Sequence, residues 1–209
     1  MTPCAQATGH SRYDFGGVAR RYDQWYATPS GMAYDLAQKS DVQCFVTPAA
    51  PGARLLDVGC GTGHWSRFFA SLGYAVTGAD ISREMLETAR EQPANGADYL
   101  RAGACALPFA DRLFDVVASM PAIEFIADVP RALREMFRCV KPGGQVVIGT
   151  LNRRAPVNAE RLSAGREPYV SARLFSPEEL HALLQPFGAP RMVASEPEWR
   201  FLARNLDQH

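Results

Sequence analysis

The chain has 209 residues, and 22 Lys and Arg balance 22 Asp and Glu, so its formal net charge is zero. This length is enough for one domain with a sizeable core. Zero net charge gives no bulk electrostatic attraction to nucleic acid. No apolar run approaches the length that spans a bilayer, so neither nucleic acid nor a membrane span is expected.

The cysteines are widely spaced and form no Cys-x-x-Cys pair, so they predict neither a disulfide framework nor a zinc site. The first ten residues lack the charged and apolar segments of a signal peptide. We therefore expect residues 1–12 to be a flexible tail and residues 13–209 to be a single domain, located in the cytoplasm and without a metal.

The segment 13–50 is rich in aromatic residues and precedes the first predicted strand. Apolar and aromatic spacing predicts a short amphipathic helix over 17–26, and a second helix over 32–46. Two interpretations are open. The segment is a helical lid whose aromatic faces stabilise a cation by roughly 0.5–2 kcal/mol, or its aromatic side chains simply cover one edge of the core.

A short apolar run ending at Val58 predicts a buried parallel strand, and Gly59, Gly61 and Gly63 follow it. Such glycines are typical of a turn with unusual dihedral angles that lets a ligand approach the backbone. A helix follows, so its free N–H groups would point at that ligand. The dinucleotide fingerprint needs a glycine where this chain has His64, so the pattern alone fits many nucleotide sites.

The stretch 74–80 predicts a second strand that ends in the carboxylate of Asp80. Asp80 lies about 20 residues beyond the glycine turn, where such folds place the acid that accepts ribose hydroxyls. Ser82 then has the position of an N-cap for the next helix.

The later part of the chain continues the alternation of strands and helices. The expected elements are strands over 98–102, 114–119 and 145–150, a helix over 128–140, a helix begun by a capping box at Ser176, and an antiparallel hairpin of strands over 189–194 and 199–203. The segment 152–175 has no clean period and is rich in arginine. It is either a substrate cover that favours an acidic acceptor or a solvated basic surface.

Several of these stretches occur together in one known family. Leu-Leu-Asp-Val-Gly-Cys-Gly-Thr-Gly at 55–63 and Gly-Ala-Asp-Ile-Ser-Arg-Glu-Met-Leu at 78–86 resemble the class I S-adenosylmethionine-dependent methyltransferases. Leu-Pro-Phe at 107–109, Phe-Asp-Val-Val at 114–117 and Lys-Pro-Gly-Gly at 141–144 follow in that family's order and spacing. The likeness is strongest to small-molecule enzymes of the kind found in ubiquinone biosynthesis.

The resemblance implies a fold, a cofactor and an activity. The fold would be α/β and Rossmann-like, with a doubly wound, mostly parallel seven-stranded sheet and an antiparallel strand near the C-terminus. The cofactor would be S-adenosyl-L-methionine, and the partner a small-molecule methyl acceptor, acidic if the arginines of 152–175 face it. A homodimer is compatible with the sequence.

The resemblance also implies a cofactor site. Its expected residues are Tyr22, Asp57, Gly59, Cys60, Gly61, Gly63, Asp80, Ile81, Gly103, Ala104 and Met120. Tyr22 would contact the cofactor from the lid, and Ile81 would stack on the adenine. Asp57 would hold the glycine turn and the methionine end of the cofactor, or cap local backbone N–H groups. Cys60 is interpreted as a packing residue.

Gly103 departs from the family pattern, which usually has an aspartate there to recognise the adenine amino group. We therefore expect weaker adenine selection or a compensating group elsewhere, while the backbone N–H of Ala104 can still serve a ring nitrogen. Loss of cofactor binding is the less favoured outcome. A protein that binds the cofactor without transferring a methyl group is one rival function, and a dinucleotide-dependent oxidoreductase is another.

The reaction expected from the resemblance is in-line attack of an acceptor on the cofactor methyl group, with orientation contributing about 7–11 kcal/mol. A general base is needed only if the acceptor holds its proton tightly. The candidates are His64, Glu124, Tyr22 and Tyr169, and none of them is assigned a catalytic role.

Overall fold

The computed structural model describes residues 11–92, 95–195 and 200–205. The expected flexible tail lies outside the described residues over 1–10. Its last two residues are placed. Ser11 forms an isolated antiparallel bridge with Ile126, and the backbone N–H of Arg12 donates to the carbonyl of Phe125 at 2.8 Å.

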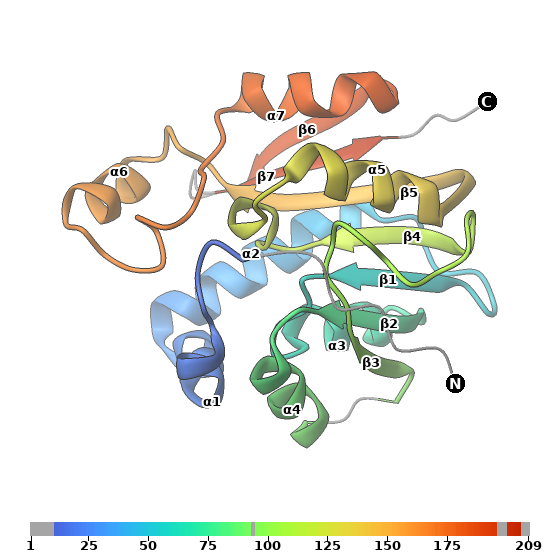
Figure 1. Cartoon of the computed structure of the whole chain (residues 1–209), viewed down its shortest axis with the longest axis horizontal. Coiled ribbons are helices and arrows are strands. Elements are labelled where there is room, and N and C mark those ends of the chain that lie inside the picture. Colours follow the sequence, from blue (N-terminus) through green and yellow to red (C-terminus); the bar gives the residue numbers. More distant parts are fainter. Residues whose placement is uncertain (1–10, 93–94, 196–199, 206–209) are drawn as a thin grey trace.

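The described residues form one seven-stranded sheet in the order β3-β2-β1-β4-β5-β7-β6 (Figure 1). The strands are β1 (Arg54–Val58), β2 (Ala75–Asp80), β3 (Ala97–Arg101), β4 (Phe114–Ser119), β5 (Val140–Leu151), β6 (Pro190–Ser195) and β7 (Arg200–Asn205). The first five are parallel to one another, and β7 runs antiparallel to both β5 and β6. The expected α/β, Rossmann-like parallel sheet is confirmed.

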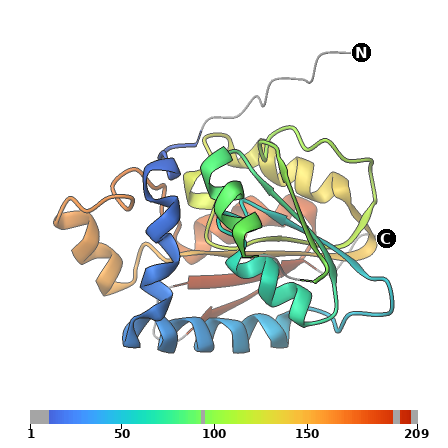
Figure 2. The ribbon, with the colours of Figure 1, turned by 90° about the horizontal axis from the view of Figure 1, so that it is seen from below.

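Helices cover both faces of this sheet. They are α1 (Ala19–Tyr22), α2 (Pro29–Phe45), α3 (His64–Ser71), α4 (Arg83–Glu91), α5 (Val129–Cys139), α6 (Pro156–Ser163) and α7 (Pro177–Leu184), with the 3-10 turns η1 (Gly16–Val18), η2 (Asp23–Ala27), η3 (Ile123–Phe125) and η4 (Gln185–Phe187). Figure 2 shows α2 along one side of the sheet and α5 on the other. None of the described helices is long and apolar enough to cross a membrane.

Two apolar clusters fill the layers between helices and sheet. One joins α5 and α7 to the sheet through side chains such as Leu133, Met136 and Leu180. The other joins α2 and α3 to the opposite face through side chains such as Val42 and Phe69. All five are fully buried, as the three- and four-residue spacing of apolar positions in the helices requires.

The N-terminal helices differ from the prediction in their boundaries. The expected helix over 17–26 is a chain of short turns, η1, α1 and η2. The second helix was expected to begin at residue 32, but α2 begins at Pro29. The hydroxyl of Thr28 accepts a hydrogen bond from the backbone N–H of Gly31, and proline follows this cap at the first helical position. This cap lets the helix begin one turn earlier.

Two later segments also differ from the prediction. The segment 152–175, which has no clean period, contains α6, because Pro156 begins a helix and the buried Asn158 side chain donates to the carbonyl of Asn152 at 2.8 Å. The strand expected over 145–150 is longer. It begins at Val140 and includes the Lys-Pro-Gly-Gly stretch at 141–144. The pairing of β5 with β4 shifts its register there, between Phe114 and Val116 of β4.

The predicted capping box at the start of α7 is present. The Ser176 hydroxyl accepts from the backbone N–H of Glu179 at 3.3 Å, and the Glu179 carboxylate accepts from the backbone N–H of Ser176 at 2.8 Å. These bonds satisfy two N–H groups that the helix itself leaves unpaired.

We expect Ser176→Ala to lower the free energy of unfolding by about 1 kcal/mol, because it removes one half of this box. Urea denaturation monitored by circular dichroism measures the change. Ser163→Ala, which removes an exposed hydroxyl from the end of α6, is the matched control and should change stability by no more than about 0.5 kcal/mol. Equal stabilities for the two variants would contradict the role of the box.

Candidate functional site

The turn between β1 and α3 presents its backbone to a cavity. Gly59 and Gly61 have φ values of +75° and +53°, in the left-handed region that favours glycine. A Cβ atom on Gly59 would lie 2.4 Å from the Cβ of Ala122, so the turn packs tightly against the segment after β4. A Cβ on Gly61 would meet no protein atom within 4 Å. Open backbone surface at Gly61 therefore faces the cavity that it lines.

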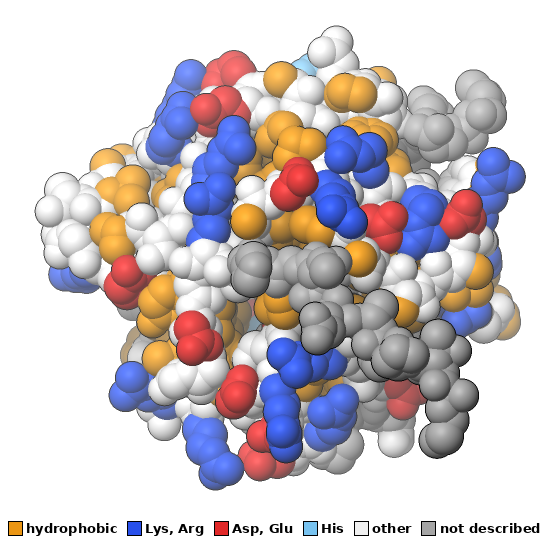
Figure 3. All heavy atoms as spheres, in the orientation of Figure 1, with side chains coloured by type: hydrophobic (Ala, Val, Ile, Leu, Met, Phe, Trp, Pro, Cys, Tyr) orange, Lys and Arg blue, Asp and Glu red, His pale blue; other side chains and the backbone are white. Residues whose placement is uncertain are grey.

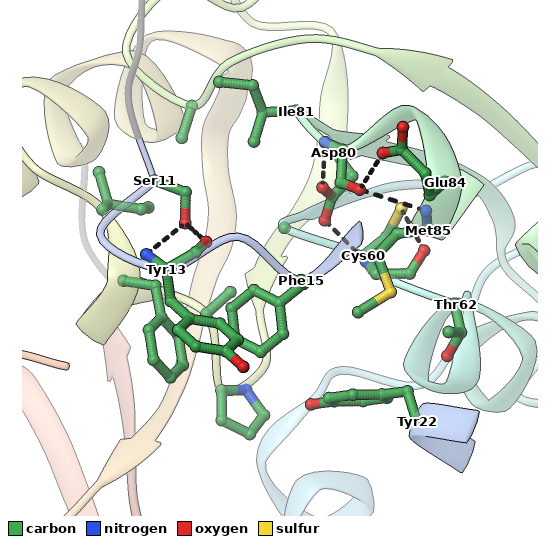
Figure 4. Close-up of a pocket in the computed structure, with 18 of the residues that line it drawn as sticks. Ser11, Tyr13, Phe15, Tyr22, Cys60, Thr62, Asp80, Ile81, Glu84 and Met85 are labelled. Atoms are coloured by element: carbon green, nitrogen blue, oxygen red, sulfur yellow. Dashed lines mark hydrogen bonds between the residues drawn. The ribbon is translucent and has the colours of Figure 1, made fainter. Parts of the chain in front are cut away.

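Asp80 connects this turn to the end of β2. The backbone N–H of Gly61 donates to Asp80 Oδ2 at 2.8 Å, and that of Ser82 donates to Oδ1 at 2.8 Å. Burial raises the pKa of Asp80, and the backbone N–H groups oppose that rise. A carboxylate has about four acceptor positions, so each oxygen can accept another hydrogen bond from a ligand hydroxyl. Figure 4 shows Asp80 beside Cys60 and Ile81 at the cavity.

The cavity has a volume of about 420 Å³, which suits a small ligand. Most of the residues expected to bind the cofactor meet there. Those that line the cavity are Tyr22, Gly59, Cys60, Gly61, Asp80, Ile81, Gly103, Ala104 and Met120. Asp57 and Gly63 do not line it, so their expected direct contact with a ligand has no support from their placement.

Asp57 lies beneath the glycine turn and is fully buried. The hydroxyl of Ser66 donates to Asp57 Oδ2 at 2.6 Å, which ties the first turn of α3 to β1. Burial raises the pKa of Asp57 to about 7, although the bond from Ser66 opposes this, and the charge of Asp80 adds to the rise. Asp57 thus supports the turn from below, through a side-chain hydroxyl rather than through the backbone N–H groups proposed from the sequence.

Gly63 and Cys60 serve packing. Gly63 is the N-cap of α3 at φ +78°, and a Cβ there would lie 2.4 Å from the Tyr99 hydroxyl oxygen. Burial raises the pKa of the Cys60 thiol well above its ordinary value, and the charges of Asp80 and Asp57 act in the same direction. A thiol that stays protonated is a poor nucleophile.

The N-terminal segment forms the opposite wall of the cavity with aromatic rings. The ring of Phe15 packs edge-on against Phe125 at 4.8 Å and against Tyr22 at 6.0 Å between centroids. Figure 4 shows Tyr13, Phe15 and Tyr22 across the cavity from Asp80. The sequence placed all three in an aromatic segment interpreted as a lid, but it singled out Tyr22 as the contact to the cofactor. No local signal marks Tyr13 and Phe15 as cavity-lining residues, because their neighbours there, Phe125 and Ile126, are distant in the sequence.

Two carboxylates fasten this aromatic wall to the glycine turn. Asp23 accepts from the Thr62 hydroxyl at 2.6 Å and from Arg67 Nη2 at 3.2 Å. Asp35 lies 2.6 Å from His64 Nε2. These charge-assisted bonds are partly shielded from solvent, and bonds of this kind are stronger than those between neutral groups.

The cavity has no carboxylate at Gly103, as the sequence indicates. Arg101 of β3 lines the cavity, and its Nε donates to the carbonyl of Ile81 at 2.9 Å. A guanidinium group is a donor only, so Arg101 does not replace the missing acceptor.

The four candidates for a general base are in different environments. His64 and Tyr22 line the cavity. Glu124 is fully buried outside its wall and accepts from the Thr150 hydroxyl at 3.0 Å. Tyr169 also lies outside the wall, with the guanidinium carbon of Arg161 4.4 Å from its ring centre. Among the described residues, no cluster of three or more His, Cys, Asp or Glu could hold a metal ion.

The sequence is similar to those of known methyltransferases. Residues 56–148 match the family model described as a methyltransferase domain. The chain is 33% identical over 205 residues to the ubiquinone/menaquinone biosynthesis C-methyltransferase UbiE of Vibrio parahaemolyticus, a match that covers 93% of this chain and 72% of that enzyme. It is 46% identical over 105 residues to the malonyl-[acyl-carrier protein] O-methyltransferase of Pectobacterium atrosepticum. That match covers 50% of this chain and 41% of the relative, so the chain spans less than half the length of that relative.

Solved structures share the fold. A structure from Thermotoga maritima, described as an S-adenosylmethionine-dependent methyltransferase and a possible histamine N-methyltransferase, superposes with a TM-score of 0.72 at 25% identity. The superposition covers 93% of this chain and 98% of that one. The magnesium protoporphyrin IX methyltransferase of Synechocystis, solved with bound S-adenosylhomocysteine, gives a TM-score of 0.73 at 15% identity over 93% of this chain and 96% of that one, which is evidence for the fold alone.

We expect Asp57→Asn to change how stability depends on pH. The pKa of Asp57 is about 7 in the folded chain and near 3.8 when exposed, so the folded state binds more protons between these values and stability falls as pH rises through them. The amide does not titrate. The variant should therefore gain on the order of 2–4 kcal/mol relative to the wild type between pH 4 and pH 7, with no further gain above that range.

Urea unfolding of both proteins across this pH range measures the difference. A constant offset between them is expected in addition, because the buried amide N–H₂ needs partners that the carboxylate did not. Asp98→Asn on the exposed part of β3 is the control. Parallel pH curves for Asp57→Asn and the wild type would contradict the raised pKa.

Proposed function

Since the chain belongs to the family of S-adenosylmethionine-dependent methyltransferases, we propose that it transfers a methyl group from S-adenosyl-L-methionine to a small-molecule acceptor. The observation that carries the proposal is the cavity between the glycine turn and the aromatic wall, with the Asp80 carboxylate and the open backbone at Gly61 on one side.

The residues of the cavity fit this cofactor. Asp80 can accept hydrogen bonds from the ribose hydroxyls with the lone pairs that the backbone leaves free. Ile81 offers an apolar side chain to one face of the adenine. The backbone at Gly61 leaves room for a ligand where any other residue would place a Cβ atom. Tyr22 brings an aromatic face to the same cavity, and such faces attract cations.

When bound, the cofactor supplies a methyl group on a positively charged sulfur. The chain's own residues then have three tasks. The glycine turn and Asp80 fix the position of the ligand, and the aromatic wall excludes water. Met120, at the carboxyl end of β4, borders the space where an acceptor would approach. No residue needs to form a covalent bond with either substrate.

A small-molecule acceptor is supported by the relative named for ubiquinone/menaquinone biosynthesis. Another relative is named for malonyl-[acyl-carrier protein], in which the methylated group is carried on a protein. The sequence suggested an acidic acceptor on the strength of the arginines of 152–175. In the structure, Arg153 and Arg154 make ion pairs with Glu179 and Glu178 of α7, at 3.0 and 2.9 Å. These two guanidinium groups are thus already paired with surface carboxylates. That gives more weight to the interpretation of the segment as a solvated surface.

The rival functions have less support. A dinucleotide-dependent oxidoreductase would need a glycine in place of His64 to complete the dinucleotide-binding fingerprint. The matching family and relatives are methyltransferases rather than oxidoreductases. A protein that binds the cofactor without transfer would form no S-adenosylhomocysteine. On the face shown in Figure 3, basic side chains lie in separate groups interspersed with acidic ones, which gives no support to nucleic acid as the acceptor. Cytoplasmic location and a homodimer stay predictions.

The first test is binding of the cofactor. We expect isothermal titration of S-adenosylmethionine or S-adenosylhomocysteine to give micromolar affinity. Asp80→Asn should weaken binding at least about tenfold, because hydrogen bonds to a charged group contribute about 1.5–3 kcal/mol. Asp98→Asn, on the exposed part of the neighbouring β3, is the matched control and should bind as the wild type does. Absence of binding by the folded wild type would overturn the proposal, with Gly103 as the first residue to examine.

A second variant tests the position of the ligand. Gly61→Ala adds a methyl group that meets no protein atom, so it should block the ligand while the chain stays folded. Gly52→Ala has the same type of backbone strain, with φ +78° and open space around its Cβ, but lies outside the cavity. Both variants should lose similar stability, of the order of 1 kcal/mol, and only Gly61→Ala should lose affinity for S-adenosylhomocysteine. Unchanged affinity in Gly61→Ala would show that the ligand lies elsewhere.

A further inference from the structure

A histidine and an aspartate form a close pair at the wall of the cavity. His64 Nε2 lies 2.6 Å from Asp35 Oδ1, and the two side chains are only 16% and 15% exposed. The other oxygen of Asp35 accepts from Lys39 Nζ at 2.6 Å. Burial raises the pKa of Asp35, but the hydrogen bonds and charges of His64 and Lys39 together bring it below its ordinary value. Asp35 is therefore a carboxylate at neutral pH.

The imidazole ring has a fixed orientation. The ring of Tyr26 stacks on it with 3.8 Å between centroids and 5° between planes, and Trp65 packs edge-on at 6.2 Å. A carboxylate can only accept, so Nε2 carries the proton of the neutral ring and Nδ1 carries the lone pair. Among the described residues, Nδ1 has no hydrogen-bond partner. The arrangement of base and orienting carboxylate is the one found in catalytic triads.

The other candidates for a base are less suitable. Glu124 and Tyr169 do not line the cavity. Tyr22 does, but a phenol ordinarily keeps its proton near pH 7. His64 alone among the four combines access to the cavity with a hydrogen-bonded carboxylate that orients its ring.

We propose that His64 is the general base that takes a proton from the methyl acceptor, that Asp35 is its positioning residue, and that the acceptor is a phenol or an enol. This inference rests on the proposed methyl transfer. A carboxylate acceptor is already ionised at neutral pH, so its methylation needs no general base. A phenol or enol holds its proton until the reaction, so its methylation does need one. The aromatic rings of Phe15 and Phe125 at the cavity wall favour a planar acceptor.

The acceptor's O–H proton moves to Nδ1 of His64, and the electron pair of that bond stays on the acceptor. The acceptor's oxygen, or the ring carbon conjugated to it, forms the new bond to the methyl carbon. The pair of the carbon–sulfur bond leaves with the sulfur, which becomes a neutral thioether. After methylation at oxygen, the imidazolium ion of His64 releases its proton to solvent. After methylation at carbon, that carbon loses its proton to solvent, and the imidazolium ion returns its proton to the oxygen.

Several charged groups surround the imidazole. The titratable and charged side chains on the elements packed against it are Asp35 and Lys39 from α2, Asp23 and Tyr26 from η2, Tyr22 from α1, and Arg67 from α3 itself. Of these, Asp35 is the one within hydrogen-bonding distance of a ring nitrogen of His64.

The experiment compares His64→Gln, Asp35→Asn and wild type with two acceptors, a water-soluble alkyl hydroquinone and a malonyl thioester of pantetheine. Formation of S-adenosylhomocysteine is measured from pH 5.5 to 9. We expect turnover of the hydroquinone, with kcat/KM rising with pH along one titration limb. His64→Gln should lower kcat about 10²–10⁴-fold and remove that limb. Asp35→Asn should lower kcat less than His64→Gln does and should keep the limb, because the imidazole is still present.

Two readouts separate a base from a merely structural residue. Calorimetric affinity for S-adenosylhomocysteine should change far less than kcat does in both variants, because the base acts on the acceptor and Asp23 still ties the aromatic wall to the glycine turn. In NMR spectra, the imidazole signals absent from His64→Gln should shift when the hydroquinone is added to wild type saturated with S-adenosylhomocysteine. His181→Gln, an exposed histidine of α7, is the matched control and should leave every value unchanged.

The outcomes that overturn the inference differ from those that overturn methyl transfer. Turnover of the malonyl thioester with His64→Gln fully active would show a carboxylate acceptor and no base. A large loss of affinity for S-adenosylhomocysteine in His64→Gln, with kcat unchanged, would assign the pair to the cofactor. Binding of S-adenosylmethionine with no turnover of the hydroquinone would exclude the acceptor class, whereas absence of binding would be a failure of the proposed function itself.

Discussion

The bond between the backbone N–H of Gly61 and the carboxylate of Asp80 is the contact on which the site depends. It joins the turn after β1 to the end of β2, so the floor of the cavity is fixed by two parallel strands rather than by a loop alone. The turn that makes this contact needs glycines. Gly59 and Gly61 have left-handed backbone conformations, and a side chain at Gly59 would also collide with Ala122. Burial disfavours the ionised Asp80, and the backbone N–H groups partly offset that cost.

Much of the parallel sheet and its helices could be predicted because their signals are local. The apolar run before Gly59 and the spacing of Leu133 and Met136 in α5 each identify an element without help from the rest of the chain. The early start of α2 was missed because the Thr28 cap and Pro29 begin the helix ahead of the apolar positions from which it was predicted. The helix α6 was missed because its apolar side chains form no regular stripe, and the residue that it buries is the polar Asn158.

The two sides of the site could be predicted to different degrees. Residues on the strand ends, such as Gly61, Asp80 and Ile81, follow from the rule that ligands bind at the carboxyl ends of parallel strands. The opposite wall could be predicted only as an aromatic segment with Tyr22 as its contact, because Phe15 packs there against Phe125, far away in the sequence. The partner of His64 could not be predicted. Nothing in the sequence near Asp35 indicates that α2 brings its carboxylate within hydrogen-bonding distance of an imidazole at the start of α3.

The fastening of the aromatic wall has a consequence for the motions of the N-terminal segment. Asp23 and Asp35 tie that wall to the same glycine turn that a ligand would contact, and Ser11 is bridged to Ile126 beyond it. Any outward movement of the wall must break these bonds, and segment motions of this kind take microseconds to milliseconds. A ligand that bridged the wall and the glycine turn would strengthen the same connection and slow that movement.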